Sequence, residues 1–223
     1  MNKNHDNILK IRELLNLKTN HVDFNLLIKD LYSNSKNLKN ITTIVGEALS
    51  GKTKVVLGYL ESESLKNKSV AYLTTDIKEA QKLLTQSTIN PNNIFCTEVS
   101  YLDELFPLIR KSLNAGFKCF VIDCLTSLMG DFLLLRETLG SINQDLTRHN
   151  AFLLLTVSTR KNTQHHNTIS SISHPTFSHQ SNIVLATTLD NSYSNKDFTI
   201  TVKVLKNRNG NPNKEFKISG KFS

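Results

Sequence analysis

Apolar residues recur along the chain in two alternating patterns, one typical of buried strands and the other of helices. Short β-branched or apolar runs are each followed by a segment with apolar residues at helical spacing. Three such pairs follow one another, at residues 41–45 and 54–65, 69–76 and 77–86, and 93–99 and 102–116. Because strands that alternate with helices pair in parallel and carry the helices on their faces, the pattern predicts an α/β fold.

The second half of the chain continues this order and then departs from it. Residues 118–125 and 150–158 are apolar runs typical of strands buried on both faces, and residues 132–149 between them have helical spacing. The polar segment 160–180 is predicted to be a long loop. Three strands joined by tight turns are predicted after it, at residues 182–190, 197–207 and 215–223. We therefore expect a mostly parallel sheet that ends in antiparallel strands.

Composition narrows the class of protein. Of 223 residues, 39% are hydrophobic and 21% charged, which predicts one soluble domain and argues against a membrane protein or a disordered chain. Cys96, Cys119 and Cys124 have no zinc spacing and no even number for disulfides, and the first residues are too polar for a signal peptide. These features predict the cytoplasm. The net charge of +8 favours a polyanionic partner, although abundant Lys and Asn also arise from a biased genome.

The strongest motif lies between the first strand and the helix that follows it. Its sequence, GEALSGKT, fits G-x-x-x-x-G-K-[ST] at every position. The residues are Gly46, Glu47, Ala48, Leu49, Ser50, Gly51, Lys52 and Thr53. In this motif backbone N–H groups surround a phosphate, Lys52 neutralises phosphate oxygens and the Thr53 hydroxyl binds Mg²⁺. The alternative is a chance match in a loop, which the flanking strand and helix disfavour. We therefore predict a site for ATP and Mg²⁺.

A carboxylate that shares the Mg²⁺ is expected at the end of a buried strand. Asp123 holds this position in CFVIDCL, after four apolar or small residues. The alternative is an ordinary aspartate at a strand end, but an unpartnered carboxylate after so apolar a run is costly. Lys52 and Asp123 are therefore candidate catalytic residues, and Thr53 and Asp123 are the candidate Mg²⁺ ligands.

Four segments resemble, in sequence and in order, those of the RecA-type recombinase ATPases. They are VGEALSGKT, VIDCLTSL, LLLTVSTR and VKVLKNRNGNPNKEFKISG. The stretch before the motif is also similar to that of the archaeal and eukaryotic branch, which includes RadA and RadB. The resemblance spans residues 18–222 and implies a RecA-like P-loop core over 18–223. Residues 1–17 are predicted to be a helical extension, because apolar residues recur at helical spacing over 5–16. The layout is most similar to the short RadB branch, because the core takes nearly the whole chain.

Two positions depart from the family pattern. Where these ATPases place a glutamate that positions the attacking water, the matching stretch has Asp76, which is one methylene shorter. Asp76 is thus a candidate catalytic residue, and its alternative role is to cap the helix that starts at Ile77. Where the family places a glutamine that senses the γ-phosphate, this chain has Ser158. The resemblance therefore implies weak or absent ATP hydrolysis.

Basic residues in two segments match positions where the family handles phosphate. The segment 160–180 corresponds to its second DNA-binding loop, and the candidates for DNA contacts there are Arg160, Lys161, His165 and His166. A zinc site at the histidines and a solvated loop are the alternatives. Lys206 and Arg208 match two basic residues that reach the nucleotide of the neighbouring subunit. Solvated residues on an edge strand are the alternative for this pair.

The resemblance implies a role in DNA repair and homologous recombination. The expected protein is a RadB-like accessory that binds ATP, Mg²⁺ and single- or double-stranded DNA and assists a RadA-type recombinase. A homo-oligomer is a possible further assembly. Its expected location is the nucleoid, or the nucleus for a eukaryotic source. The alternative is a RecA-fold regulatory or assembly subunit, KaiC-like or Elongator-like, without a DNA role. A third possibility is a P-loop kinase. The predicted strands at the end of the chain argue against it, because such kinases generally have helical lids.

Overall fold

The computed structural model describes most of the chain from residue 40 onward. The described residues are 40–65, 68–86, 89–128, 132–159, 179–191, 197–208 and 213–221. The extension predicted over residues 1–17 and most of the loop predicted over 160–180 lie outside these ranges. So do the four candidates for DNA contacts, Arg160, Lys161, His165 and His166.

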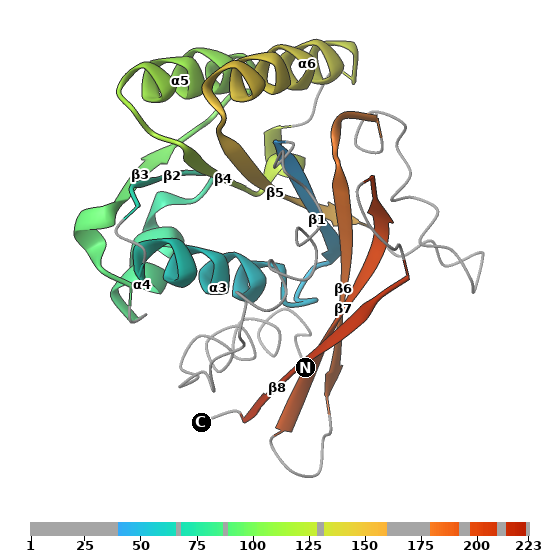
Figure 1. The fold of residues 1–223 in the computed structure, drawn as a ribbon. Coiled ribbons are helices and arrows are strands. Elements are labelled where there is room, and N and C mark those ends of the chain that lie inside the picture. Colours follow the sequence, from blue (N-terminus) through green and yellow to red (C-terminus); the bar gives the residue numbers. More distant parts are fainter. Residues whose placement is uncertain are drawn as a thin grey trace, which may run out of the picture.

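Eight strands form one sheet in the order β3-β2-β4-β5-β1-β6-β7-β8 (Figure 1). The strands are β1 (Ile41–Glu47), β2 (Val70–Thr74), β3 (Ile94–Glu98), β4 (Cys119–Asp123), β5 (Phe152–Thr159), β6 (Ile183–Asn191), β7 (Asp197–Asn207) and β8 (Glu215–Lys221). Neighbours from β3 to β6 are parallel, whereas β7 is antiparallel to both β6 and β8. The prediction of a mostly parallel sheet with antiparallel last strands is confirmed for the described residues.

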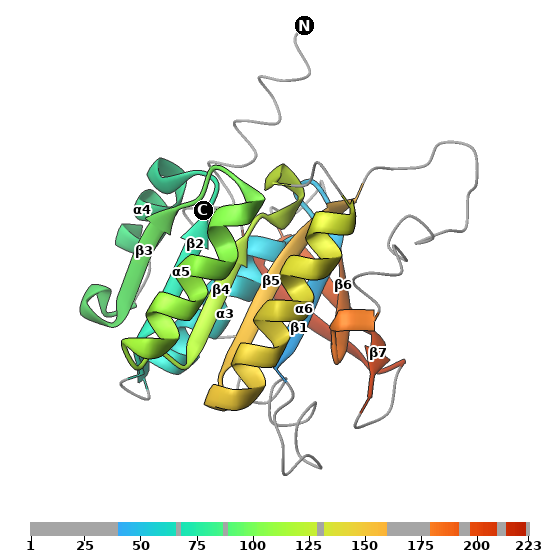
Figure 2. The same cartoon turned by 90° about the horizontal axis from the view of Figure 1, so that it is seen from above.

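Helices cover both faces of the sheet in pairs (Figures 1 and 2). On one face lie α3 (Lys52–Leu65) and α4 (Ile77–Gln86), and on the other α5 (Leu102–Asn114) and α6 (Phe132–His149). All four fall within a few residues of their predicted ranges. The short 3-10 helices Pro91–Asn93 and Leu125–Leu128 were not predicted, because so few residues carry no periodicity. Among the helices in the described ranges, none combines the length and apolar character of a membrane span.

Two apolar clusters, one on each face, hold the helices to the sheet. On the α3 side, Val56 and Leu60 are buried together with Ile44 of β1. On the opposite side, Ile109 of α5 and Leu139 of α6 are buried in the second cluster. Each such side chain contributes roughly 1.5–3 kcal/mol by leaving water. The central strands are therefore fixed from both faces, which explains their continuous apolar sequences.

The parallel strands all run one way, so the sheet has a carboxyl edge and an amino edge. At the carboxyl edge, β1 ends beside β5, where Gly46 pairs with Ser158. At the same edge, β2 ends beside β4, where Thr74 pairs with Asp123. The amino edge, where these strands begin, lies about 16 Å away along β1 at ~3.3 Å per residue. The predicted phosphate motif and the predicted Mg²⁺ ligand therefore share one edge of the sheet.

Candidate nucleotide site

Residues 46–53, which we call the glycine loop, connect the carboxyl end of β1 to the start of α3. The Ser50 N–H donates to the Glu47 carbonyl (3.2 Å), and Leu49 and Gly51 have positive φ angles of 65° and 91°. The helix then begins at Lys52. Because the first N–H groups of a helix have no helical acceptors and form the positive end of its dipole, this start suits an anion.

Two strands from the last part of the chain form a wall for the glycine loop. A Cβ atom added at Gly46 would lie 2.6 Å from Thr187 Oγ1, and one at Gly51 would lie 2.7 Å from Ile200 Cδ1. The hydroxyls of Ser50 and Thr187 form a buried hydrogen bond of 2.7 Å. Close packing therefore requires both glycines, and the positive φ angle requires the second one as well. The sequence motif gave no indication of Thr187 in β6 or Ile200 in β7.

Lys52 turns its ammonium group back onto the loop. Nζ donates to the carbonyls of Gly46 (3.0 Å) and Glu47 (2.7 Å), and the residue is only 7% exposed. Burial lowers the pKa of the Lys52 amine, while electrostatic interactions with Cys124, Asp123 and Glu47 oppose that shift. An ionised phosphate oxygen is a stronger acceptor for an ammonium group than a carbonyl is. A phosphate in the loop would therefore compete well for this cation.

Asp123 ends β4 with both carboxylate oxygens held by hydroxyls. Tyr72 of β2 donates to Oδ2 (3.0 Å), and Thr156 of β5 donates to Oδ1 (2.5 Å). Burial, and then the carboxylate itself, raise the pKa of Tyr72 well above its usual value, so the phenol remains a donor. These contacts orient the carboxylate without neutralising it. Sequence reasoning missed both donors, because each stands inside an apolar strand with no motif around it.

Ser158 lies beside Cys124, the residue that follows Asp123, on the strand β5 that separates β4 from β1. Its N–H donates to Thr126 Oγ1 (2.6 Å), and its Oγ lies 3.5 Å from Cys124 Sγ. Burial raises the pKa of Cys124, but hydrogen bonds, chiefly with Thr126 and Ser158, outweigh it and lower the pKa below its ordinary value. The serine that replaces the expected glutamine therefore contacts a thiol and a hydroxyl at the carboxyl edge.

Asp76 acts as the N-cap of α4. Its Oδ1 accepts a hydrogen bond from the Glu79 N–H (3.0 Å), and its own N–H donates to Thr74 Oγ1 (3.1 Å). This is the capping role that the sequence left open. The neighbouring Thr75 N–H donates to the Asp123 carbonyl (3.2 Å), which places Asp76 at the same edge as the candidate Mg²⁺ ligand. Its catalytic role stays a prediction.

Lys206 and Arg208 lie at the amino edge, away from the glycine loop of their own chain. Lys206 in β7 pairs with Val184 near the start of β6, and its Nζ donates to the Ser181 carbonyl (2.8 Å). Arg208 Nη2 donates to the His179 carbonyl (2.6 Å). A contact between these residues and a nucleotide would therefore need a neighbouring subunit, which is also what the resemblance implies.

The residues at the glycine loop fit ATP and Mg²⁺ chemically. Lys52 and the start of α3 suit phosphate, while the Thr53 hydroxyl and the Asp123 carboxylate are the hard oxygen ligands that Mg²⁺ prefers. The hydroxyls that hold Asp123 leave it lone pairs for a metal, because a carboxylate has about four acceptor positions. Within the described ranges, no three His, Cys, Asp or Glu residues gather into a metal-binding group.

Comparison with protein-family models and with curated proteins gives no match for this chain. Three features meet at the carboxyl edge: a helix start, a buried ammonium group and an oriented carboxylate.

Proposed function

We propose that this chain binds ATP and Mg²⁺ through a RecA-like core. The observation that carries the proposal is the Lys52 ammonium group, buried at the start of α3 on two loop carbonyls and within the field of Asp123. Burying a cation is costly, and a phosphate that completes its coordination would offset that cost. The mostly parallel sheet with antiparallel last strands supports a RecA-like arrangement, because the sequence resemblance implies the same layout.

Hydrolysis of the bound ATP is expected to be slow or absent. Asp76 uses one carboxylate oxygen to cap α4, and its side chain is one methylene shorter than the glutamate of the family pattern. Alignment of the attacking water supplies much of the rate in this reaction class. Ser158 is engaged with Cys124 and Thr126, which supports a weak response to the γ-phosphate.

The proposed biological role is DNA repair and recombination, as an accessory to a RadA-type recombinase. The resemblance over residues 18–222 and the net charge of +8 support it. The candidates for DNA contacts begin with Arg160, directly after Thr159, and Thr159 pairs with Glu47 of the glycine loop. A conformational change of the glycine loop on nucleotide binding would therefore occur close to Arg160, where the proposed DNA-binding segment starts.

Thermal unfolding with and without ATP and Mg²⁺ tests the nucleotide site. Ligand at 100 times its Kd stabilises a folded protein by about 2.7 kcal/mol, so the wild-type Tm should rise. Lys52→Ala should abolish the rise. The matched control is Lys78→Ala, which removes the same charge from an exposed position on α4 and should keep the full rise. An equal rise in Lys52→Ala and wild type would refute the site.

Binding of a labelled single-stranded oligonucleotide, followed by fluorescence anisotropy, tests the DNA role. With ATP and Mg²⁺ at 50 mM NaCl the wild type should bind, and the affinity should fall steeply with salt because phosphate contacts release counterions. A protein that binds ATP but no oligonucleotide would lose the repair role. The regulatory or assembly subunit without a DNA role would then be the better description.

A further inference from the structure

Basic side chains gather at the amino edge, the end of the sheet opposite to the glycine loop. They come from α5, from the residue before β4, from the last turn of α6 and from the end of β7. We call this set the amino-edge cluster, and it comprises Arg110, Lys118, Arg148, Lys206 and Arg208.

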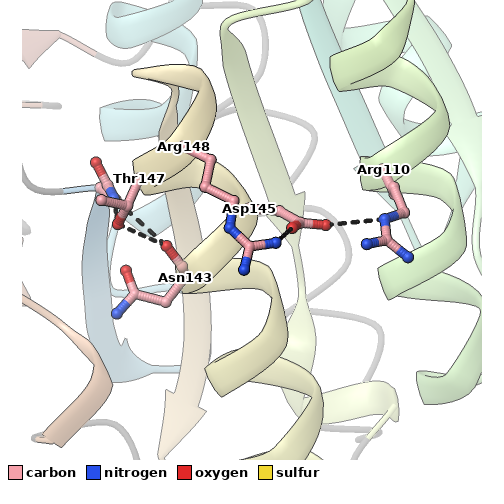
Figure 3. Close-up of polar contacts among 6 residues, drawn as sticks. Arg110, Asn143, Asp145, Thr147 and Arg148 are labelled. Atoms are coloured by element: carbon pink, nitrogen blue, oxygen red, sulfur yellow. Dashed lines mark hydrogen bonds and ion pairs between the residues drawn. The ribbon is translucent and has the colours of Figure 1, made fainter.

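Two of these residues share a single buried carboxylate. Asp145 of α6 has a side chain that is 7% exposed, and it lies between Arg110 Nε (3.2 Å) and Arg148 Nη1 (3.4 Å) (Figure 3). The two arginine side chains are 56% and 67% exposed. Because one carboxylate cancels only one of the two charges, the group keeps a net positive charge. Each guanidinium has five N–H donors in a rigid fork, so donors remain for an anion outside.

Backbone carbonyls hold the other three cations in place. Lys118 Nζ donates to the carbonyl of His149, the last residue of α6 (3.0 Å), and Lys206 and Arg208 donate to carbonyls just before β6. A carbonyl carries no net charge, so these contacts orient the cations and leave their charge in place. Burial, and then the charge of Arg208, lower the pKa of Lys206. An anion at this position would relieve the repulsion between the two cations.

Helix α6 lies close to both parts of the cluster. Its last turn carries Arg148 and contacts Lys118, and at its middle Gln180 Nε2 lies 3.7 Å from the place of a Gly140 Cβ atom. From β4, which Lys118 precedes, to β7, which carries Lys206, four strand spacings of ~4.8 Å span roughly 19 Å, or between about five and six 3.4 Å steps along one DNA strand. The five cations and Asp145 together carry a net charge of +4.

We propose that the amino-edge cluster binds the phosphodiester backbone of a nucleic acid. The proposal depends on the DNA-binding role proposed above and adds a second surface to the candidates that begin with Arg160. Arginine forks match phosphate geometry, and anchored cations lose little side-chain freedom on binding. The carboxyl edge holds the glycine loop, where the buried Lys52 ammonium group and the start of α3 suit the phosphates of a nucleotide. A phosphodiester backbone at the amino edge would therefore leave the glycine loop to the nucleotide.

A protein partner suits this surface less well. The centre of a protein–protein interface is apolar and poor in charge. Within the described ranges, the exposed large apolar residues are Phe95, Tyr101, Leu133 and Leu134. Tyr101, Leu133 and Leu134 lie just before α5 and at the start of α6, at the carboxyl edge. Phe95 lies near the start of β3 and contacts Phe117, one residue before Lys118, so this aromatic pair lies at the amino edge. One aromatic pair is a small apolar area for the centre of a protein interface, and the five cations fit a phosphate backbone better.

The test compares two double variants that remove the same charge. Lys118→Gln/Arg148→Gln changes the cluster, while Lys78→Gln/Lys217→Gln removes two exposed lysines from α4 and β8. The probe is a fluorescein-labelled oligo-dT 20-mer, titrated from 50 to 200 mM NaCl. Two lost contacts to single-stranded DNA should lower the salt slope by about 1.4 and weaken binding on the order of tenfold or more at 50 mM NaCl. The control should stay within about threefold of wild type.

Further measurements distinguish failure of the amino-edge proposal from failure of the DNA-binding role. Both double variants should keep the wild-type Tm rise with ATP and Mg²⁺, and Arg208→Gln, at the other end of the cluster, should lower the salt slope by about 0.7. If wild type binds the oligonucleotide and the cluster variants bind like the control, the amino-edge proposal is wrong and the DNA role stands. If wild type binds no oligonucleotide, the DNA-binding role and the amino-edge proposal both fail, and the ATP proposal is unaffected. Binding to phosphatidylserine vesicles that depends on Arg148, without oligonucleotide binding, would also overturn the amino-edge proposal.

Discussion

Replacing Gly51 with alanine tests whether the wall of the glycine loop is as tight as the structure shows. The substitution adds one methyl group where φ is +91° and where Ile200 atoms lie at 2.7, 2.8 and 3.0 Å from the new Cβ. Gly116 offers a matched control, because its φ is +94° and no atom lies within 4 Å of its added Cβ. The two variants share the backbone strain and differ in the clash.

The expected cost follows from these two contributions. Alanine in the left-handed region costs about 1–2 kcal/mol, which both variants should lose from the free energy of unfolding. Overpacking a filled site costs about 1–3 kcal/mol more, and only Gly51→Ala should show it. With a urea m-value of about 2 kcal/mol per M, the unfolding midpoint of Gly51→Ala should lie about 0.5–1.5 M below that of Gly116→Ala.

Urea unfolding followed by circular dichroism, without nucleotide, measures both variants. A second pair isolates the clash: in an Ile200→Ala background, Gly51→Ala should cost no more than Gly116→Ala does in wild type. Equal midpoints for the two single variants would refute the close contact between the loop and β7. Unequal midpoints that persist in the Ile200→Ala background would assign the cost to another neighbour.

Three further outcomes follow from the site. At pH 8, iodoacetamide should modify Cys124 before Cys96, because hydrogen bonds lower the pKa of Cys124 whereas burial raises that of Cys96 to about 11; peptide mass spectrometry that finds Cys96 labelled first would contradict this. Asp76→Ala should lower the free energy of unfolding by about 1 kcal/mol through loss of the α4 cap, and an unchanged urea midpoint would exclude that cap. Tyr72→Phe should cost about 1.5–3 kcal/mol, because Asp123 loses a charge-assisted hydrogen bond; a stability equal to wild type would mean that the bond contributes nothing.

The order of strands and helices could be predicted from the sequence because it is a local property. The run at 41–45 and the helical spacing at 54–65 each depend on residues close together in the chain, and both elements are present in the structure. The GEALSGKT motif between them is likewise local, because eight consecutive residues are enough to recognise it. The exact ends differ by a few residues, as for β1, which continues to Glu47 because Gly46 and Glu47 still pair with β5.

The neighbours of the site could not be predicted, because they come from distant parts of the chain. Thr156 reaches Asp123 across 33 residues, and Thr187 reaches Ser50 across 137. Each lies in an apolar strand where its hydroxyl only interrupts the pattern. The sequence also left the role of Asp76 open, because capping and catalysis ask for the same residue type at the same place. The hydrogen bond to Glu79 establishes the first role without testing the second.

The contacts of Gly46 with Thr187 and of Gly51 with Ile200 mean that the eight-residue motif is not a transferable module. A fragment that ended after β5 would keep the whole motif, Asp76 and Asp123, and would still lack the surface against which both glycines fit. Because of these contacts, a shift of β6 or β7 would also move the glycine loop. A protein that paired with the outer strand β8 and shifted β7 would therefore reshape the glycine loop without touching it.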